Sequence, residues 1–223
     1  MTQLLRGAAA VALLALFTAP AAAQVQGLAV HGPGVPSGLV LAGHVGFPND
    51  VAGGGRAYGV SGGIGTGLFG GTAIIAMSDP DGDADGTVSV GANVGFRMIG
   101  GPLVPISASL LAGVGYAKPE SGILPGEDTS LLHVPLAVSI GVSVPSPAFS
   151  IRPWIAPRLD VLRVSPDGGE SETLTDFGVS AGIELTTISG LGIHAAYDWV
   201  SRDGGEPAVF DIGLQYAIRV PGL

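Results

Sequence analysis

The sequence predicts an all-β fold, an antiparallel transmembrane β-barrel of about ten strands, with eight strands as the alternative. Three observations predict it. Hydrophobic residues alternate with small or polar residues along long segments, short connections alternate with long acidic ones, and aromatic residues gather near the segment ends. Alternation with a period of two is typical of a strand that turns one face toward an apolar environment.

Composition already excludes several classes of protein. The 223 residues include 38 Gly and are 47% hydrophobic but only 12% charged, whereas soluble domains carry about 25% charged residues. The absence of cysteine excludes disulfides, thiolate metal sites and a cysteine nucleophile. Because the net charge is −9 and Lys118 is the single lysine, no nucleic-acid partner is expected.

The first 23 residues have the pattern of a Sec-type signal peptide. Arg6 is followed by an apolar stretch over residues 7–18 and by three alanines at 21–23 that form a cleavage signal. We therefore divide the chain into a signal peptide (1–23), a short periplasmic lead (24–37) and a barrel domain (38–223). An exported barrel of this kind belongs in the outer membrane of a Gram-negative-type bacterium.

The mature chain contains ten segments with two-residue periodicity. In residues 87–99, for example, Val88, Val90 and Val94 share one parity, while Ser89 and Gly91 share the other. Most segments reach the ~9 to 11 residues that a tilted strand needs to cross a bilayer. The expected strands are 39–47, 56–66, 68–78, 87–98, 103–117, 131–144, 149–164, 175–188, 191–202 and 208–220.

The connections between these segments alternate in length. Short turns are expected near residues 65–67, 100–102, 145–147 and 189–190, and longer, acidic loops at 48–55, 79–86, 118–130, 165–174 and 203–207. Short turns at one rim and long polar loops at the other are typical of an outer-membrane barrel with both termini in the periplasm.

Aromatic residues on the hydrophobic parity fall near the strand ends, as they do in the two aromatic girdles of a membrane barrel. Trp154 is the exception, because it lies on the opposite parity. The predicted girdle residues are Phe47, Tyr58, Phe69, Phe96, Tyr116, Phe149, Phe177, Tyr197, Trp199, Phe210 and Tyr216.

The opposite parity is filled with Gly, Ala and Ser, together with scattered titratable residues that include His44 and His133. Charges on that face are tolerable only if they pair or meet water, and a barrel of about ten strands has room for little besides side chains. We therefore expect a narrow lumen holding a charge network of Arg97, Arg152, Arg158, Asp160, Glu184, His194, Asp198, Asp211 and Arg219.

Two prolines oppose regular pairing in the seventh long segment. Pro153 and Pro157 lie four residues apart, so both missing N–H groups face the same neighbouring strand. The sequence predicts a bulge or a weakened seam on that side.

The C-terminal segment has a pattern of its own. Asp211, Gly213, Tyr216 and Ile218 fit the order polar-x-Gly-x-x-aromatic-x-hydrophobic, which resembles the signal read by the outer-membrane assembly machinery. On this pattern the chain resembles the small outer-membrane β-barrel family of OmpA-type, OmpX-type and opacity-type barrels, although family members usually end on an aromatic residue and this chain continues through residues 219–223. The resemblance implies insertion by that machinery and a structural, adhesive or small-channel role.

One loop resembles the start of a calcium-binding loop. Asp81, Asp83 and Asp85 alternate in the order D-x-D-x-D-G, which gathers oxygen ligands around a hard cation. The twelfth position is Ala92 rather than Glu, so a solvated acidic loop is the favoured interpretation. Calcium binding, or a divalent bridge to lipopolysaccharide, is the alternative, and no other cofactor is expected.

The sequence thus favours a structural or surface-interaction protein of the outer membrane, with outer-membrane lipid, lipopolysaccharide and the assembly machinery as partners. A small pore for ions or small solutes is the alternative. His194, Asp198 and Asp211 leave open an omptin-like hydrolase, but no matching motif is present and no enzymatic activity is expected. The rival classes are a soluble periplasmic β-sandwich and a helical inner-membrane protein.

Overall fold

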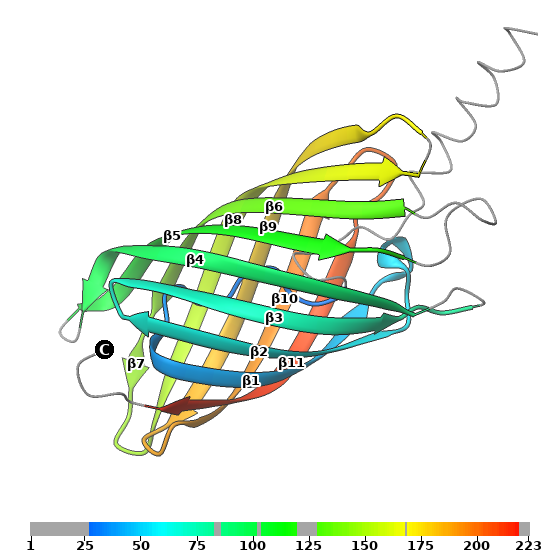
Figure 1. Ribbon diagram of the computed structural model, residues 1–223. Helices are drawn as coiled ribbons and strands as arrows, with labels where there is room; N and C mark the ends of the chain where they lie inside the picture. Colours follow the sequence, from blue (N-terminus) through cyan, green and yellow to red (C-terminus); the bar gives the residue numbers. More distant parts are fainter. Residues whose placement is uncertain (1–26, 83–85, 102–103, 120–128, 168, 219–223) are drawn as a thin grey trace, which may run out of the picture.

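The protein is a closed antiparallel β-barrel of ten long strands and one two-residue strand (Figure 1). The computed structural model describes residues 27–82, 86–101, 104–119, 129–167 and 169–218. The expected signal peptide therefore lies outside the described residues. The strands are β1 (Ser37–Pro48), β2 (Arg56–Thr66), β3 (Phe69–Asp79), β4 (Thr87–Gly101), β5 (Val104–Ala117), β6 (Thr129–Val142), β7 (Val144–Pro145), β8 (Phe149–Pro166), β9 (Glu172–Thr187), β10 (Leu191–Ser201) and β11 (Ala208–Ile218).

Each of the ten long strands pairs with the long strands before and after it in sequence, and the first and last strands close the ring. β1 pairs with β11 from Leu39–Ile218 to Pro48–Val209, and β6 pairs directly with β8 on the far side. A closed ring leaves no unpaired edge, as a strand-built membrane protein requires. The predicted ten-stranded barrel is confirmed, so the sandwich and helical alternatives are wrong. No helix within the described ranges is both long enough and apolar enough to span a membrane.

The two rims differ as the sequence predicts. Short connections such as those between β2 and β3 and between β9 and β10 lie at one end, and the strand ends that the longer connections join lie at the other (Figure 1). The first long connection contains a short 3-10 helix, η1 (Asp50–Ala52), which Asn49 caps by accepting a hydrogen bond from the Ala52 N–H at 2.9 Å. We call the two ends the short-turn end and the long-loop end.

The wall of the barrel separates an apolar outside from a small-residue inside. Valine, leucine and isoleucine side chains of one parity are exposed on the outer surface, as at Val94 and Leu214. Side chains of the other parity are buried within the ring, where Leu111, Trp154 and Ala156 form one packed cluster. The inward position of Trp154 explains why it alone leaves the aromatic parity.

The proline-rich side of the barrel contains an interrupted seam. Pairing of β6 with β8 passes from Ala137–Arg158 to Ile140–Ile155, skipping the positions next to Pro157, while β8 pairs with β9 without a break. The register is the same on both sides of the gap. The predicted weak seam is therefore present as a gap in the ladder rather than as a bulge, because a missing N–H removes a bond without adding a residue.

The chain that precedes β1 corrects one expectation. Residues 27–36, predicted to belong to a periplasmic lead, lie inside the barrel, where Leu28, Val30 and Val35 are buried (Figure 1). Gly27 lies against Ala57 near the long-loop end, and Val35 lies against Gly70 near the short-turn end. We call residues 27–36 the luminal segment. It runs the length of the lumen because its apolar side chains are removed from water there.

Candidate functional site in the barrel lumen

The glycine-rich inner wall makes room for the luminal segment. A Cβ at Gly59 would lie 2.5 Å from Leu28 Cδ1, and one at Gly95 would lie 2.9 Å from Val35 Cγ2. Side chains at these wall positions would therefore occupy the space that the segment fills. The abundance of glycine on the inward parity thus has a packing reason.

Polar groups of the wall hold the backbone of the luminal segment. The Val30 N–H donates to Asp198 Oδ2 at 3.1 Å and the Ala29 N–H donates to Asp211 Oδ2 at 3.3 Å. Nearer the short-turn end, Arg97 Nη2 donates to the Val35 carbonyl at 2.8 Å. Since a buried backbone N–H without a partner is costly, these bonds fix where the segment sits.

Arg158 is the centre of the largest buried charge cluster among the described residues. Its Nε donates to Asp160 Oδ2 at 2.7 Å, and its Nη1 and Nη2 donate to the two oxygens of Asp198 at 3.0 and 2.6 Å. Ser180 Oγ accepts from Nη1 at 2.8 Å and donates to Asp198 at 2.6 Å. All four side chains are buried, so the two-point guanidinium–carboxylate contact offsets the cost of removing these charges from water.

Strand register explains how Arg158 reaches Asp198. Arg158 on β8 pairs with Gly178 on β9, and Ser180 on β9 pairs with Asp198 on β10. A Cβ at Gly178 would lie 2.8 Å from Arg158 Cζ. The guanidinium therefore crosses β9 over a glycine to reach the next strand.

Two histidines lie beside this cluster. His133 on β6 is bonded through Nε2 to Asp160 Oδ1 at 2.6 Å, so Asp160 bridges the histidine and Arg158. His31 of the luminal segment is buried, and its two ring nitrogens have no hydrogen-bond partner among the described residues.

A second cluster lies where β1, β11 and β10 adjoin. His44 Nδ1, His194 Nε2 and Asp211 Oδ1 form a triangle with edges of 3.2 Å between the two nitrogens, 3.2 Å from His194 to Asp211 and 3.5 Å from His44 to Asp211. Both imidazoles flank Gly213, which pairs with His44 on one side and with His194 on the other.

The remaining members of the predicted network lie apart from these two clusters. Arg97 contacts the luminal segment, Arg152 donates to Ser107 Oγ at 3.5 Å, and Glu184 accepts from Thr186 Oγ1 at 3.1 Å and from Gln215 Nε2. Arg219 lies outside the described residues. The structure thus divides the expected single network into separate groups.

Asp198 and Asp211 do not face each other across the last hairpin. Asp198 pairs with Val209, and Asp211 pairs with Ala196. Asp198 is bound by Arg158 and Ser180, whereas Asp211 is bound by the two histidines. The two carboxylates therefore belong to different clusters, although both accept a hydrogen bond from the luminal segment.

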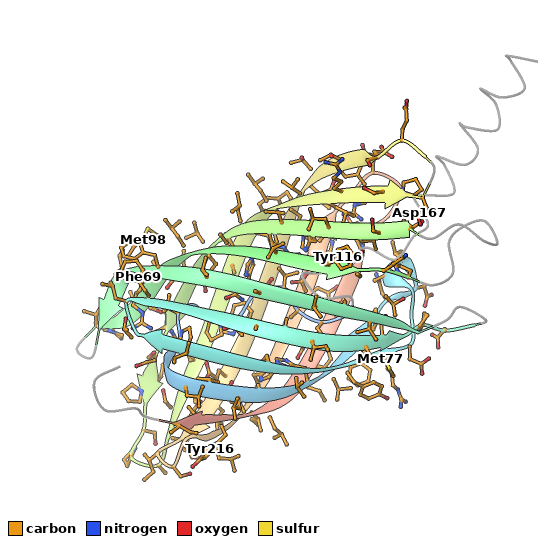
Figure 2. The ribbon with its side chains drawn as sticks, viewed as in Figure 1. Phe69, Met77, Met98, Tyr116, Asp167 and Tyr216 are labelled. Carbon is orange, nitrogen blue, oxygen red and sulfur yellow. The ribbon has the colours of Figure 1, made fainter. Side chains whose placement is uncertain are left out.

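The predicted girdle residues lie on the outer surface. In Figure 2, Phe69, Met98 and Tyr216 lie toward the short-turn end, and Met77 and Tyr116 toward the long-loop end. All eleven side chains are exposed except that of Trp199, which is half-buried. Cross-strand pairs occur within the set, as between Phe69 and Phe96, whose ring centroids are 4.9 Å apart.

The acidic loop and the C-terminal pattern have further contacts. Asp81 accepts a hydrogen bond from the Gly55 N–H at 2.8 Å, which links the first two long loops. Asp83 and Asp85 lie outside the described residues. Within the C-terminal pattern, Tyr216 and Ile218 are exposed on the outside, Asp211 belongs to the histidine triangle, and Gly213 lies between its two imidazoles.

Sequence reasoning left several residues out of the luminal network. Three of these residues make central contacts: His44, His133 and Ser180. Their inward parity is the signal that could have placed them in the predicted network. His31 could not be found in this way, because the luminal segment has no strand periodicity.

Comparisons with known proteins concern fold. No protein-family model matches the chain. No curated protein matches it. Among solved structures, Neisserial surface protein A is similar with a TM-score of 0.42 and 14% identity over 82% of this chain and 98% of that one. The attachment invasion locus protein of Yersinia pestis, in complex with a heparin analogue, is similar with a TM-score of 0.40 and 11% identity over 81% of this chain and 99% of that one. The outer-membrane protease OmpT of Escherichia coli is similar with a TM-score of 0.38 and 9% identity over 82% of this chain and 94% of that one.

Proposed function

We propose that this chain is an integral outer-membrane protein with a structural or surface-interaction role, whose lumen is closed by its own N-terminal segment. The observation that carries the proposal is the course of the luminal segment from the long-loop end to the short-turn end. Its backbone is bonded to Asp198, Asp211 and Arg97 of the wall. A lumen occupied in this way has little room for solutes.

The outer surface supports the membrane part of the proposal. Exposed aliphatic side chains cover the outside of the strands, and aromatic residues lie toward both ends. Lipid is the environment that such a surface fits, because aromatic rings prefer the two membrane–water interfaces. Outer-membrane lipid and the assembly machinery are the partners that this role requires.

The long acidic loops support a role at the surface. The strand ends that they join lie at one end of the barrel, and Asp81 ties the second loop to the first through Gly55. Lipopolysaccharide is the partner that we propose for such loops, with divalent cations bridging its phosphates to their carboxylates.

We also propose that the protein is not an enzyme. A catalytic acid or base must reach a substrate, but Asp198 already binds Arg158, Ser180 and the Val30 N–H. We interpret its cluster as one that fixes the wall and the luminal segment.

Planar-bilayer conductance tests the proposal. We expect the refolded wild-type barrel to pass no stable current, because the luminal segment fills the ring. A variant lacking residues 27–35 is expected to show discrete openings. Stable unitary conductance of the wild type would contradict the closed lumen and favour the small pore. Slower gel migration after boiling checks that each preparation is a folded barrel.

A further inference from the structure

The triangle of His44, His194 and Asp211 has the dimensions of a metal site. Zinc binds imidazole nitrogen at about 2.0–2.1 Å in tetrahedral geometry, which places neighbouring donor atoms about 3.3–3.4 Å apart. The three donor atoms here are 3.2, 3.2 and 3.5 Å from one another. These edges match one face of a zinc tetrahedron.

Hydrogen bonding satisfies the triangle weakly. The two hydrogen bonds share His194 Nε2, whose single proton would have to be divided between His44 Nδ1 and Asp211 Oδ1. The third edge, from His44 Nδ1 to Asp211 Oδ1, is a 3.5 Å contact. With both nitrogens donating to Asp211, the two N–H groups would oppose each other across the 3.2 Å edge. A divalent cation would instead accept a lone pair from each of the three atoms at once.

The surrounding contacts orient the three donor groups. His44 Nε2 is bonded to Ser61 Oγ at 2.9 Å, which leaves Nδ1 directed into the triangle. Asp211 Oδ2 accepts the Ala29 N–H at 3.3 Å, which leaves Oδ1 for the histidines. Such outer contacts are the usual means by which proteins fix metal-binding histidines and carboxylates.

A glycine makes the approach of the two imidazoles sterically feasible. A Cβ at Gly213 would lie 2.4 Å from His194 Cε1 and 2.6 Å from His194 Nε2, and 2.3 Å from the Gly43 carbonyl oxygen of the neighbouring strand. Any side chain at this position would displace His194 from the triangle. His44 and His194 also keep 16% and 15% of their side-chain surface exposed, so an ion and a fourth, water ligand can reach them.

From this geometry we infer that the chain binds one zinc-type divalent transition ion through His44 Nδ1, His194 Nε2 and Asp211 Oδ1. Two nitrogen ligands favour zinc and its neighbours over Ca²⁺ and Mg²⁺, which prefer oxygen. The ion would link β1, β11 and β10, and hence the strand pair that closes the barrel. This site does not depend on whether the lumen conducts.

Zinc titration of the untagged, refolded and chelator-treated barrel tests the site. We expect one Zn²⁺ per chain by calorimetry, and a higher unfolding temperature with zinc than without it. His44→Ala and His194→Ala should each weaken binding by at least the ~10–100-fold that loss of an outer-shell contact costs.

His31→Ala is the matched control, because it removes an imidazole that lies in the lumen but outside the triangle; we expect its zinc affinity to stay within twofold of the wild type. Absence of stoichiometric zinc binding by the wild type would overturn the inference. Equal affinity of wild type and His44→Ala would overturn it too. If the variants fail to fold, the visible spectrum of Co²⁺ bound to the wild type decides, since a four-coordinate spectrum supports the site and a six-coordinate spectrum contradicts it.

Discussion

At the scale of single residues, Arg158 is the side chain that binds two buried carboxylates at once. It contacts Asp160, Asp198 and Ser180, which come from three different strands. Inward parity alone predicts that these charges need partners, but it does not predict which carboxylate Arg158 binds. That choice depends on the register of β8, β9 and β10 and on the space above Gly178.

Replacement of Arg158 should therefore destabilise the barrel strongly. Arg158→Met leaves two buried carboxylates without their main partner, and we expect the free energy of unfolding to fall by about 3–5 kcal/mol. Urea-induced unfolding in lipid vesicles measures the change. Arg163→Met is the control on the same strand: its side chain is exposed, so a change within about 0.5 kcal/mol is expected. A loss below about 1 kcal/mol for Arg158→Met would contradict the role of the cluster.

At the scale of strands, the sequence predicts well where each strand lies and which of its side chains face outward. It predicts less well how regularly neighbouring strands pair. Regular alternation in residues 87–98 correctly predicts β4, whose even-numbered side chains are exposed. The gap between β6 and β8 follows from the missing N–H of Pro157. The side on which the gap occurs could not be predicted, because sequence does not reveal which neighbour an N–H faces. A similar gap lies between β5 and β6 beside Pro135, where pairing passes from Ala112–Leu136 to Gly115–His133.

The interrupted seam should be visible by hydrogen exchange. In the wild-type barrel we expect the amide of Val138, which lies opposite Pro157, to exchange faster than amides of the unbroken β8–β9 ladder, because local openings begin where bonds are missing. Pro157→Val restores a donor and should slow exchange at that position, with a gain of about 0.5–1.5 kcal/mol for one hydrogen bond. Equal protection of both ladders in the wild type would show that the seam is intact.

At the scale of the whole molecule, the barrel could be predicted but its contents could not. Strand number, connection lengths and the outward aromatic parity all follow from local patterns. The apolar residues of the luminal segment, Leu28, Ala29, Val30 and Val35, are irregularly spaced. Its partners Asp198 and Asp211 are 168 and 182 residues away from the backbone groups that they bind. The histidine triangle likewise joins residues 150 positions apart, which only closure of the ring brings together.

The position of the luminal segment is the central claim, and a disulfide tests it most directly because the natural chain has no cysteine. A Cβ at Gly34 would lie 3.5 Å from Ser109 Cβ, within the range of disulfide bonds. Gly34 has a φ of +112°, so a cysteine there carries backbone strain, and gel migration before and after boiling must first show that the variant folds. We predict that Gly34→Cys with Ser109→Cys forms a disulfide in the folded barrel, detected as linked peptides by mass spectrometry. Gly34→Cys with Leu110→Cys should form none, because Leu110 faces outward. Free thiols in the first variant, or equal linkage in both, would contradict a segment inside the lumen.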